Sequence, residues 1–430
     1  MSLLAYPHPR AAGAIDVVVI GAGHAGLSAS SLLSRQGVGH VVLERGEVAN
    51  SWRHERWDSL RLLTPNWQTQ LPGSPYQGED PDGFMAIPEL VETLTGYAAA
   101  MNVPVHTQTT VTTVRPDGLG YEVVTNRGTW RARAVIIASG ACNSPVVPMV
   151  AADLPDTICQ LTPFDYTHAG EVDEGGVLVV GASATGLQLA HELLAHGRQV
   201  TLAAGEHVRM PRRYRGRDIF HWLSHCGIHD ERYDEIDDVS RGRRLPSPQL
   251  VGNHDLPILD LNEIQRAGGQ VTGRLMGVRD NTLQFSGSLQ NVCQLADLKM
   301  QRLLKLIDET ADAEQAPPAE SFAPTAVDLA PALTMDVDRQ NIKTVIWATG
   351  FRPDYRWLDV PVRDRKGHLR HDGGVVDAPG LYVLGLPLMR RRKSSFIFGI
   401  EDDARDITRH LSNYLEQLKR RESDGIYRYG

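Results

Sequence analysis

Cysteine is scarce in this 430-residue chain, and its four cysteines are far apart. They form neither a CxxC pair nor the clustered Cys/His spacing of a zinc site; they are Cys142, Cys159, Cys226 and Cys293. The sequence therefore predicts no metal centre and no vicinal redox pair. It favours a reduced, cytoplasmic protein.

Long apolar runs and an excess of basic residues are also missing. No run approaches the roughly 18–20 apolar residues that cross a bilayer. The chain carries 44 Lys and Arg against 52 Asp and Glu, a net charge of -8, which argues against a nucleic-acid partner. The first apolar run leads directly into a glycine turn, so residues 1–21 indicate a strand rather than a signal peptide.

A glycine-rich turn follows that first apolar run. Val17–Ile20 has strand length, and Gly21-x-Gly23-x-x-Gly26 comes directly after it. Such glycines permit a tight turn, close approach of a pyrophosphate and close helix packing, and the helix N-terminus faces the phosphates. The next strand ends in Glu44, 23 residues after Gly21, where a carboxylate accepts hydrogen bonds from an adenosine ribose. We interpret His24 as a permissive position over the pyrophosphate.

The same pattern returns later in the chain. Val177–Val180 precedes Gly181-x-Ser183-x-x-Gly186, and Ala204 stands where the first copy has its acid. Five arginines follow in "RMPRRYRGR", residues 209–217. Without a carboxylate, and with guanidinium groups nearby, a 2′-phosphate is favoured, so we expect NADPH bound by Arg209 and Arg212. The alternative is a solvated arginine loop.

Two nucleotide sites imply one resident and one visiting dinucleotide. NADPH is a hydride donor, and the usual resident acceptor with an adenine dinucleotide handle is FAD. The sequence therefore predicts an α/β fold with two Rossmann-like domains. The expected organisation is a discontinuous FAD domain, residues 1–165 and 333–430, with an NADPH domain, residues 166–332, inserted.

Several segments support this organisation. Two strands are expected to end at crossovers between the domains, one at Ala138-Ser139-Gly140 and one at Ala348-Thr349-Gly350. Residues 311–332 are rich in Ala, Pro and Glu and indicate an extended connector. Residues 380–386 predict a last strand, and residues 399–418, with acids in the first turn, predict a helix.

The chain resembles the flavin-containing monooxygenase superfamily over nearly its whole length. The resemblance rests on both glycine turns, the late "WATGF", and "NSWRHERWDSLRLLTPNWQTQLPG", residues 50–73. It is similar to a bacterial branch of FAD/NAD(P)-dependent oxidoreductases and to plant indole-pyruvate monooxygenases. The superfamily fingerprint FxGxxxHxxx(Y/F) is altered, because Leu154, Asp156 and Gln160 replace its first three fixed residues and only Phe164 is kept.

The turns and the resemblance together assign cofactor and catalytic residues. The resemblance places Asn66 near the reacting face, although a turn-capping role after Pro65 is the alternative. The expected cofactor-binding residues are Gly21, Gly23, His24, Ala25, Gly26, Glu44, Arg45, Trp52, Arg53, Arg61, Leu62, Thr64, Val111, Ser139, Gly140, Gly181, Ser183, Ala184, Thr185, Gly186, Arg209, Arg212, Thr349 and Gly350.

The resemblance implies an NADPH-dependent monooxygenase. Reduced FAD would react with O₂ to give a flavin C4a peroxide, shielded from water by NADP⁺, and would oxygenate a small organic substrate. An oxidase or disulfide-type reductase without oxygen transfer, and a nucleotide-sensing regulator of transport, are the alternatives. The altered fingerprint leaves the type of oxygenation open, and a homo-oligomer is an open alternative.

Three histidines, His221, His225 and His229, follow one another at intervals of four residues. On a helix they would share one face, where metal ligation is one interpretation. Because no carboxylate pattern accompanies them, we favour a polar helix face lining the cleft.

Overall fold

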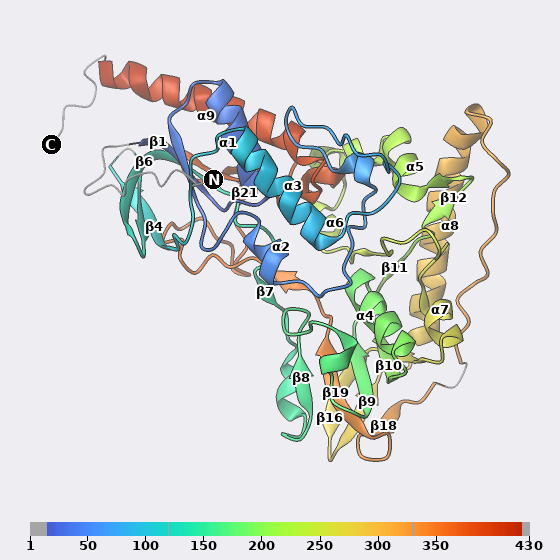
Figure 1. Ribbon diagram of the computed structural model, residues 1–430. Coiled ribbons are helices and arrows are strands. Elements are labelled where there is room, and N and C mark those ends of the chain that lie inside the picture. The colour runs from blue at the N-terminus through green and yellow to red at the C-terminus, as the bar shows by residue number, and fades with distance from the viewer. Residues whose placement is uncertain (1–14, 119, 329–330, 424–430) are drawn as a thin grey trace.

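The computed structural model describes residues 15–118, 120–328 and 331–423. Two larger sheets organise this part of the chain, a mixed one and a parallel one (Figure 1). None of its helices combines the length and the apolar character needed to cross a membrane.

The first sheet is centred on β1 and β6, whose apolar side chains are buried. Val17, Val18 and Val19 are fully buried because β-branched side chains fill both faces of a covered parallel sheet. Within the described residues this sheet has nine strands, with β4 and β5 joined through β6 and the remaining strands in the order β21 (His371–Asp372), β22 (Val375–Val376), β23 (Leu381–Val383), β6 (Gly128–Ile137), β1 (Ile15–Ile20), β2 (His40–Leu43) and β3 (Val105–His106). The hairpin strands are β4 (Val111–Asp117) and β5 (Gly120–Thr125).

The second sheet has five strands in the described part of the chain, and all of its pairings are parallel. Their order is β15 (Gln270–Gly273), β10 (Gln199–Ala204), β9 (Gly176–Val180), β19 (Ile342–Trp347) and β8 (Cys159–Leu161). Because these strands lie between β6 and β21 in the sequence, the second sheet interrupts the first. The predicted fold class is confirmed.

The expected domain limits differ from the extent of the second sheet. Its strands run from Cys159 to Trp347, so both limits of the expected insertion, 165/166 and 332/333, fall inside this stretch. β19 pairs with β9, the strand before the second glycine turn, and β8 pairs with β19 at the edge of the sheet. Sequence spacing alone did not indicate these two neighbours.

Helices cover both sheets, and α1 and α9 lie side by side across the first one (Figure 1). The glycine turns lead into α1 and α4, as predicted. The helices are α1 (His24–Arg35), α2 (Asn50–His54), α3 (Ile87–Ala100), α4 (Ala184–Ala195), α5 (Ile219–His225), α6 (Val239–Gly242), α7 (Leu261–Arg266), α8 (Leu289–Ala313) and α9 (Ile400–Ser423). The 3₁₀ turns are η1 (Asn66–Gln68), η2 (Met149–Asp153), η3 (Ala169–Glu171), η4 (Ile228–Asp230), η5 (Tyr233–Glu235) and η6 (Arg392–Ser395).

Small sheets complete the structure. They pair β7 (Ser144–Pro145) with β20 (Phe351–Arg352), β11 (Val208–Arg209) with β14 (Pro248–Gln249), β12 (Arg213–Tyr214) with β13 (Arg217–Asp218), and β17 (Thr282–Phe285) with both β16 (Leu275–Arg279) and β18 (Thr334–Asp336). The pairing of β7 with β20 holds the two interdomain crossovers against each other. The predicted strand at 380–386, the helix at 399–418 and the extended connector after α8 are all present.

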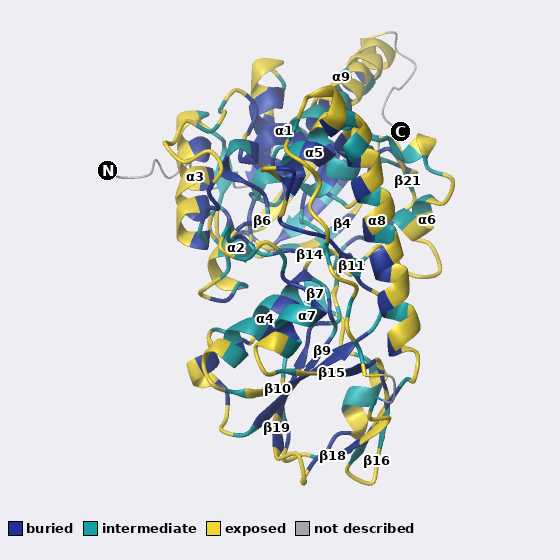
Figure 2. Ribbon diagram, turned by 90° about the vertical axis from the view of Figure 1, so that its right-hand side faces the viewer, coloured by how far each residue is buried: buried dark blue, intermediate teal, exposed yellow. Residues whose placement is uncertain are grey.

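The chain between β10 and β15 returns to the first sheet's side of the molecule. Arg212 Nη1 donates to the Leu63 carbonyl oxygen over 2.7 Å, and Lys393 Nζ lies 2.6 Å from Asp230 Oδ1. The buried strands of both sheets and the buried face of α8 are visible in Figure 2. These contacts join the segment between β10 and β15 to residues on the first sheet's side of the molecule.

Candidate functional site

The first glycine turn leaves no room for side chains where the chain folds back on itself. Gly21 has a φ of +106°, and a Cβ there would lie 2.5 Å from the Ala138 carbonyl oxygen. A Cβ on Gly26 would overlap the Gly21 carbonyl oxygen, so glycine lets α1 pack on the turn. At Gly23, by contrast, a Cβ would meet nothing within 4 Å. The turn is therefore closed underneath and open above, a cradle that fits a pyrophosphate.

Glu44 is held beside this turn at the end of β2. It is 7% exposed; Oε2 accepts the Ala22 N–H over 2.7 Å, and Oε1 accepts the Gly46 N–H over 3.1 Å. A carboxylate oxygen accepts more than one hydrogen bond, so both retain capacity for ribose hydroxyls. The Thr109 N–H donates to the Glu44 carbonyl oxygen over 2.7 Å, which brings Val111 towards the same edge.

His24 begins α1 directly over the open part of the turn. Its Nε2 is buried and has no hydrogen-bond partner among the described residues. Burial lowers the pKa of its imidazole to about 4. The side chain is therefore neutral near pH 7.

The other residues assigned to the first site fall into three groups. Ser139 and Gly140 follow β6 beside Gly21, Gly140 has a φ of +83°, and the buried Ser139 hydroxyl has no partner in the described chain. Ala25, Leu62 and Thr64 are buried, and Trp52 is half-buried with the Arg56 guanidinium 5.0 Å from its ring centre. The three arginines are engaged elsewhere: Arg45 pairs with Glu55, Arg53 pairs with Glu47, and Arg61 donates to the Phe84 carbonyl oxygen.

Asn66 makes the turn contacts that the sequence offered as one of its two alternatives. Its Nδ2 donates to the Asp80 carbonyl oxygen over 2.9 Å, and its backbone N–H donates to Gly83, so the side chain does anchor a turn. Its Oδ1, however, is buried without a partner in the part of the chain that the structure describes. A buried acceptor left unsatisfied is unfavourable by about 1–3 kcal/mol, so the atom is suited to accept a bond from a ligand.

Two neighbours of Asn66 share this property and were not assigned from the sequence. Gln68 is fully buried; its Nε2 lies 3.4 Å from Ser224 Oγ, and its Oε1 is unpartnered among the described residues. The Thr69 hydroxyl, also buried, has no partner there either. The polar run "NWQTQ" after Pro65 is the signal that would have indicated them.

The second glycine turn repeats the geometry of the first. Gly181 has a φ of +112°, a Cβ on it would overlap the Ala348 carbonyl oxygen, and a Cβ on Gly186 would overlap the Gly181 carbonyl oxygen. Ser183 precedes α4, whose first residues are Ala184 and Thr185, and its hydroxyl makes no capping bond. Gly350 has a φ of +93°, and the Thr349 hydroxyl donates to the Val146 carbonyl oxygen. This cradle also fits a pyrophosphate.

The assignment of Arg209 and Arg212 to a 2′-phosphate is wrong. Arg209 is 3% exposed and pairs with Asp260 at 2.6 Å and Asp297 at 2.8 Å. Arg212 is 1% exposed and pairs with Asp218 at 2.6 Å. Because buried guanidinium groups require such partners, these arginines are committed to the core and cannot meet a nucleotide.

The altered fingerprint has a structural explanation at Gln160. On β8, its Oε1 accepts the Trp347 indole N–H over 3.0 Å and its Nε2 donates to the Ala151 carbonyl oxygen over 3.1 Å. The amide thus links the edge strand β8 to β19 and η2. Phe164, the retained aromatic residue, stacks on Phe351 at 5.1 Å beside the crossover.

The three histidines do not share a helix face. α5 ends at His225 and Gly227 has a φ of +72°, so His229 lies on the separate turn η4. His221 and His225 stack at 3.9 Å. Within the described chain, no group of three or more His, Cys, Asp or Glu side chains is arranged to hold a metal.

His229 lies at the contact between the returning segment and the first sheet's side of the molecule. Its Nδ1 is 2.8 Å from Ser224 Oγ, and its ring is near those of Phe220, Phe396 and Phe398. Burial, reinforced by the Lys393 cation and opposed by Asp230, lowers the pKa of its imidazole to about 4.

We expect His229 to make stability depend on pH. The pKa of His229 is about 4 in the folded state and 6.5 ordinarily. Between these values the imidazole is protonated in the unfolded chain and neutral in the folded chain. The stabilisation is complete above pH 6.5 and is lost as the pH falls, by about 2 kcal/mol at pH 5. Urea unfolding at pH 7.5 and pH 5 should show this loss reduced in His229→Asn. The exposed His54→Asn control should match the wild type; equal losses in all three proteins would contradict the assignment.

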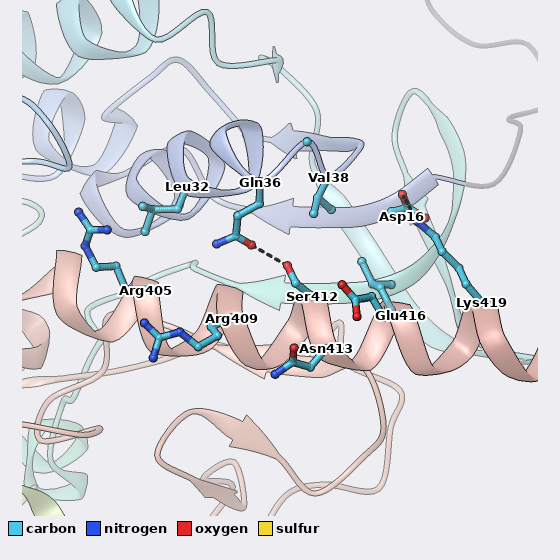
Figure 3. Close-up of a pocket in the computed structure, with 12 residues that line it drawn as sticks. Asp16, Leu32, Gln36, Val38, Arg405, Arg409, Ser412, Asn413, Glu416 and Lys419 are labelled. Carbon is cyan, nitrogen blue, oxygen red and sulfur yellow. Dashed lines mark hydrogen bonds and ion pairs between the residues drawn. The ribbon is translucent and has the colours of Figure 1, made fainter.

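A cavity of about 470 Å³ lies elsewhere, between α1 and α9. Figure 3 shows Gln36 and Ser412 joined across it by a hydrogen bond, with Arg405 and Arg409 nearby. It is lined by the C-terminal half of α1, whereas the glycine turn precedes the helix N-terminus. We do not assign it to a nucleotide.

Comparison with known proteins decides the family. The chain is 30% identical over 403 residues to a CzcO-like oxidoreductase of Geobacillus kaustophilus, covering 93% of this chain and 99% of that protein. The chain belongs to the family of CzcO-like oxidoreductases. A family model described as pyridine nucleotide-disulphide oxidoreductase matches residues 18–224.

Two further likenesses accompany this match. A flavin-containing monooxygenase from Stenotrophomonas maltophilia shares the fold, with a TM-score of 0.66, 21% identity, and coverage of 94% of this chain and 99% of that one. The probable indole-3-pyruvate monooxygenase YUCCA3 of Arabidopsis thaliana is 29% identical over 227 residues, 47% of this chain and 49% of that protein. The resemblance predicted from the sequence is confirmed. The protein is an oxidoreductase of a family that implies FAD and a pyridine nucleotide.

Proposed function

We propose that this CzcO-like oxidoreductase is an FAD- and NADPH-dependent monooxygenase that inserts one oxygen atom of O₂ into a small organic substrate. The observation that carries the proposal is the group of buried, unpartnered oxygen atoms on Asn66, Gln68 and Thr69, in a segment that contacts the returning insertion at Ser224. These acceptors and the hydroxyl favour a bound ligand with hydrogen-bond donors.

The chain's own residues would do the binding and positioning. The first turn and Glu44 would hold the adenosine and pyrophosphate of FAD, and the second turn those of NADPH. When bound, FAD supplies the chemistry by taking hydride from the nicotinamide and passing electrons to O₂. Asn66 and Gln68 would orient ligands through their free carbonyl oxygens, while the neutral His24 adds no charge beside the pyrophosphate. The hydrogen bond from Arg212 to the Leu63 carbonyl oxygen would help to keep the returning segment against this side of the molecule.

Disulfide reduction, suggested by the family model's description, needs paired thiols beside the flavin. All four cysteines are free and none pairs with another: Cys142 follows β6, Cys159 lies on β8, Cys226 follows α5, and Cys293 lies on α8. This arrangement favours oxygen as the electron acceptor.

The proposal is tested by measuring, in the purified flavin-containing protein, where the electrons from NADPH go. NADPH oxidation, O₂ uptake and H₂O₂ release are measured with indole-3-pyruvate, the compound named for the plant relatives, and with an aryl methyl thioether. We expect one of these probes to lower H₂O₂ released per NADPH and to acquire ¹⁸O from ¹⁸O₂. NADPH oxidation that returns all its electrons as H₂O₂ with both probes would indicate an oxidase. Oxidation that requires a disulfide and not O₂ would indicate a reductase.

Asn66→Ala is expected to lower oxygenated product per NADPH about tenfold, the effect of losing one hydrogen bond to a ligand. FAD content should be unchanged because Asn66 lies outside the glycine turn. Asn413→Ala, on the exposed face of α9, is the matched control and should behave as wild type. Normal coupling in Asn66→Ala would restrict this residue to anchoring its turn.

A further inference from the structure

In a Rossmann-like domain, the end of the second strand, here β10, is where NADPH is distinguished from NADH by its 2′-phosphate. The exposed cations near this end of β10 come from other elements of the fold. β10 and β15 are parallel, with Ala204 opposite Gly273, so Arg274 stands next to Gly205. A Cβ on Gly205 would lie 3.9 Å from Arg274 Cδ, in ordinary contact. Arg274 is thus brought to the nucleotide edge by sheet register, 70 residues from Ala204.

The Arg274 guanidinium is exposed and, within the described chain, makes no ion pair or side-chain hydrogen bond. The Ser286 N–H donates to the Arg274 backbone carbonyl oxygen, so the backbone from which this side chain extends is held in place. Nearby arginines differ, since Arg209 and Arg212 are buried with carboxylates. An unpaired, anchored guanidinium has free donors for a phosphate.

Lys299 of α8 supplies a second cation at the same turn. Its Nζ lies 3.0 Å from Glu206 Oε1, and the side chains are 36% and 63% exposed. An exposed pair of this kind is weak, so a phosphate dianion can replace Glu206 as the partner of Lys299. Glu206, in turn, would repel that phosphate. This turn therefore has two cations, Arg274 and Lys299, that would attract a phosphate and one carboxylate, Glu206, that would repel it.

His207, in the same turn, has a buried ring nitrogen that lacks a partner among the described residues. It is 1% exposed, and its Nδ1–H donates to the Gly205 carbonyl oxygen over 2.9 Å. Burial lowers its pKa, so the ring is neutral and Nε2 is an acceptor. That buried atom has no partner among the described residues, and a ribose hydroxyl has the donor it lacks.

We propose that Arg274 and Lys299 bind the 2′-phosphate of NADPH and that Glu206 opposes this binding. The inference rests on the proposed function only in taking the second turn as the pyridine-nucleotide site; it does not depend on oxygen transfer. The discriminating residues therefore lie directly after β15 and on α8, not in the arginine run after β10.

Binding measurements on the FAD-loaded protein test this inference without O₂ or substrate. NADP⁺, NAD⁺, 2′,5′-ADP and 5′-AMP are titrated by calorimetry into wild type, Arg274→Gln, Glu206→Gln and the control Arg279→Gln. Arg279 is an exposed arginine of the adjoining strand β16. We expect Arg274→Gln to weaken the binding of NADP⁺ and 2′,5′-ADP about tenfold. Its affinities for NAD⁺ and 5′-AMP should stay within about twofold of the wild-type values.

Glu206→Gln should raise the affinity for NADP⁺ several-fold, because it removes a charge that repels the 2′-phosphate. The affinity for NAD⁺ should not change. Raising salt from about 50 to about 300 mM should weaken NADP⁺ more in wild type than in Arg274→Gln. Equal loss of NADP⁺ and NAD⁺ in Arg274→Gln would overturn the inference, as would wild-type protein that binds NAD⁺ at least as tightly as NADP⁺. Selective binding in a protein that fails to oxygenate any probe would support it and reject only the proposed reaction.

Discussion

Gly21→Ala is expected to produce a colourless protein that does not retain FAD after purification. Alanine at a φ of +106° is strained, and its Cβ would lie 2.5 Å from the Ala138 carbonyl oxygen. Relief requires the turn to move away from β6, which removes the pyrophosphate cradle. The measurement is the flavin absorbance of the purified protein, with circular dichroism to establish that it is folded.

The second turn provides the reciprocal experiment. Gly181→Ala meets the same obstruction at Ala348, so we expect a yellow protein that has lost NADP⁺ binding. Gly96→Ala is the control, because Gly96 lies within α3 and a Cβ there would meet nothing within 4 Å. A Gly21→Ala protein with full FAD content, or a Gly181→Ala protein that loses its flavin instead, would show that the two turns have been assigned to the wrong nucleotides.

Arg209→Ala is expected to destabilise the protein by about 3–5 kcal/mol, because two buried carboxylates lose their cation. Asp260 and Asp297 would both be left without the guanidinium that now lies between them. Asp297 also accepts the Thr325 N–H and hydroxyl, both at 2.8 Å, so the connector after α8 should loosen too. Urea unfolding measures the first effect, and faster proteolysis within residues 314–328 measures the second.

Arg217→Ala is the matched control from the same arginine run. Arg217 is exposed, and its replacement should change the free energy of unfolding by no more than about 0.5 kcal/mol. If Arg209→Ala instead retained full stability and lost affinity for NADP⁺ alone, the buried network would be irrelevant and the phosphate role would be restored.

The glycine turns could be predicted from the sequence because their requirements are local. Gly21 and Gly181 need positive φ, and Gly26 and Gly186 must lack a Cβ against the carbonyl oxygen five residues before. Such constraints act over a few consecutive residues, and they recur in both copies with the same spacing. Glu44 could be located in the same way, because a strand of fixed rise carries it to the edge where the turn ends.

The arginines show where that reasoning stops. Arg209 and Arg217 belong to one short run, yet the first is buried and the second is exposed. The difference is made by Asp260 and Asp297, which lie 51 and 88 residues further along the chain. The same holds for Gln160, whose Trp347 partner is 187 residues away.

The sequence by itself determined the two glycine turns, the strands and helices around them, and the interrupted α/β organisation. Only the tertiary structure decided which cations face a ligand, which are neutralised in the core, and that Asn66, Gln68 and Thr69 keep unsatisfied oxygen atoms. The physical reason is the distance along the chain between the residues that interact. Backbone conformation is set by neighbouring residues, whereas burial and ion pairing depend on side chains that folding brings from distant parts of the chain.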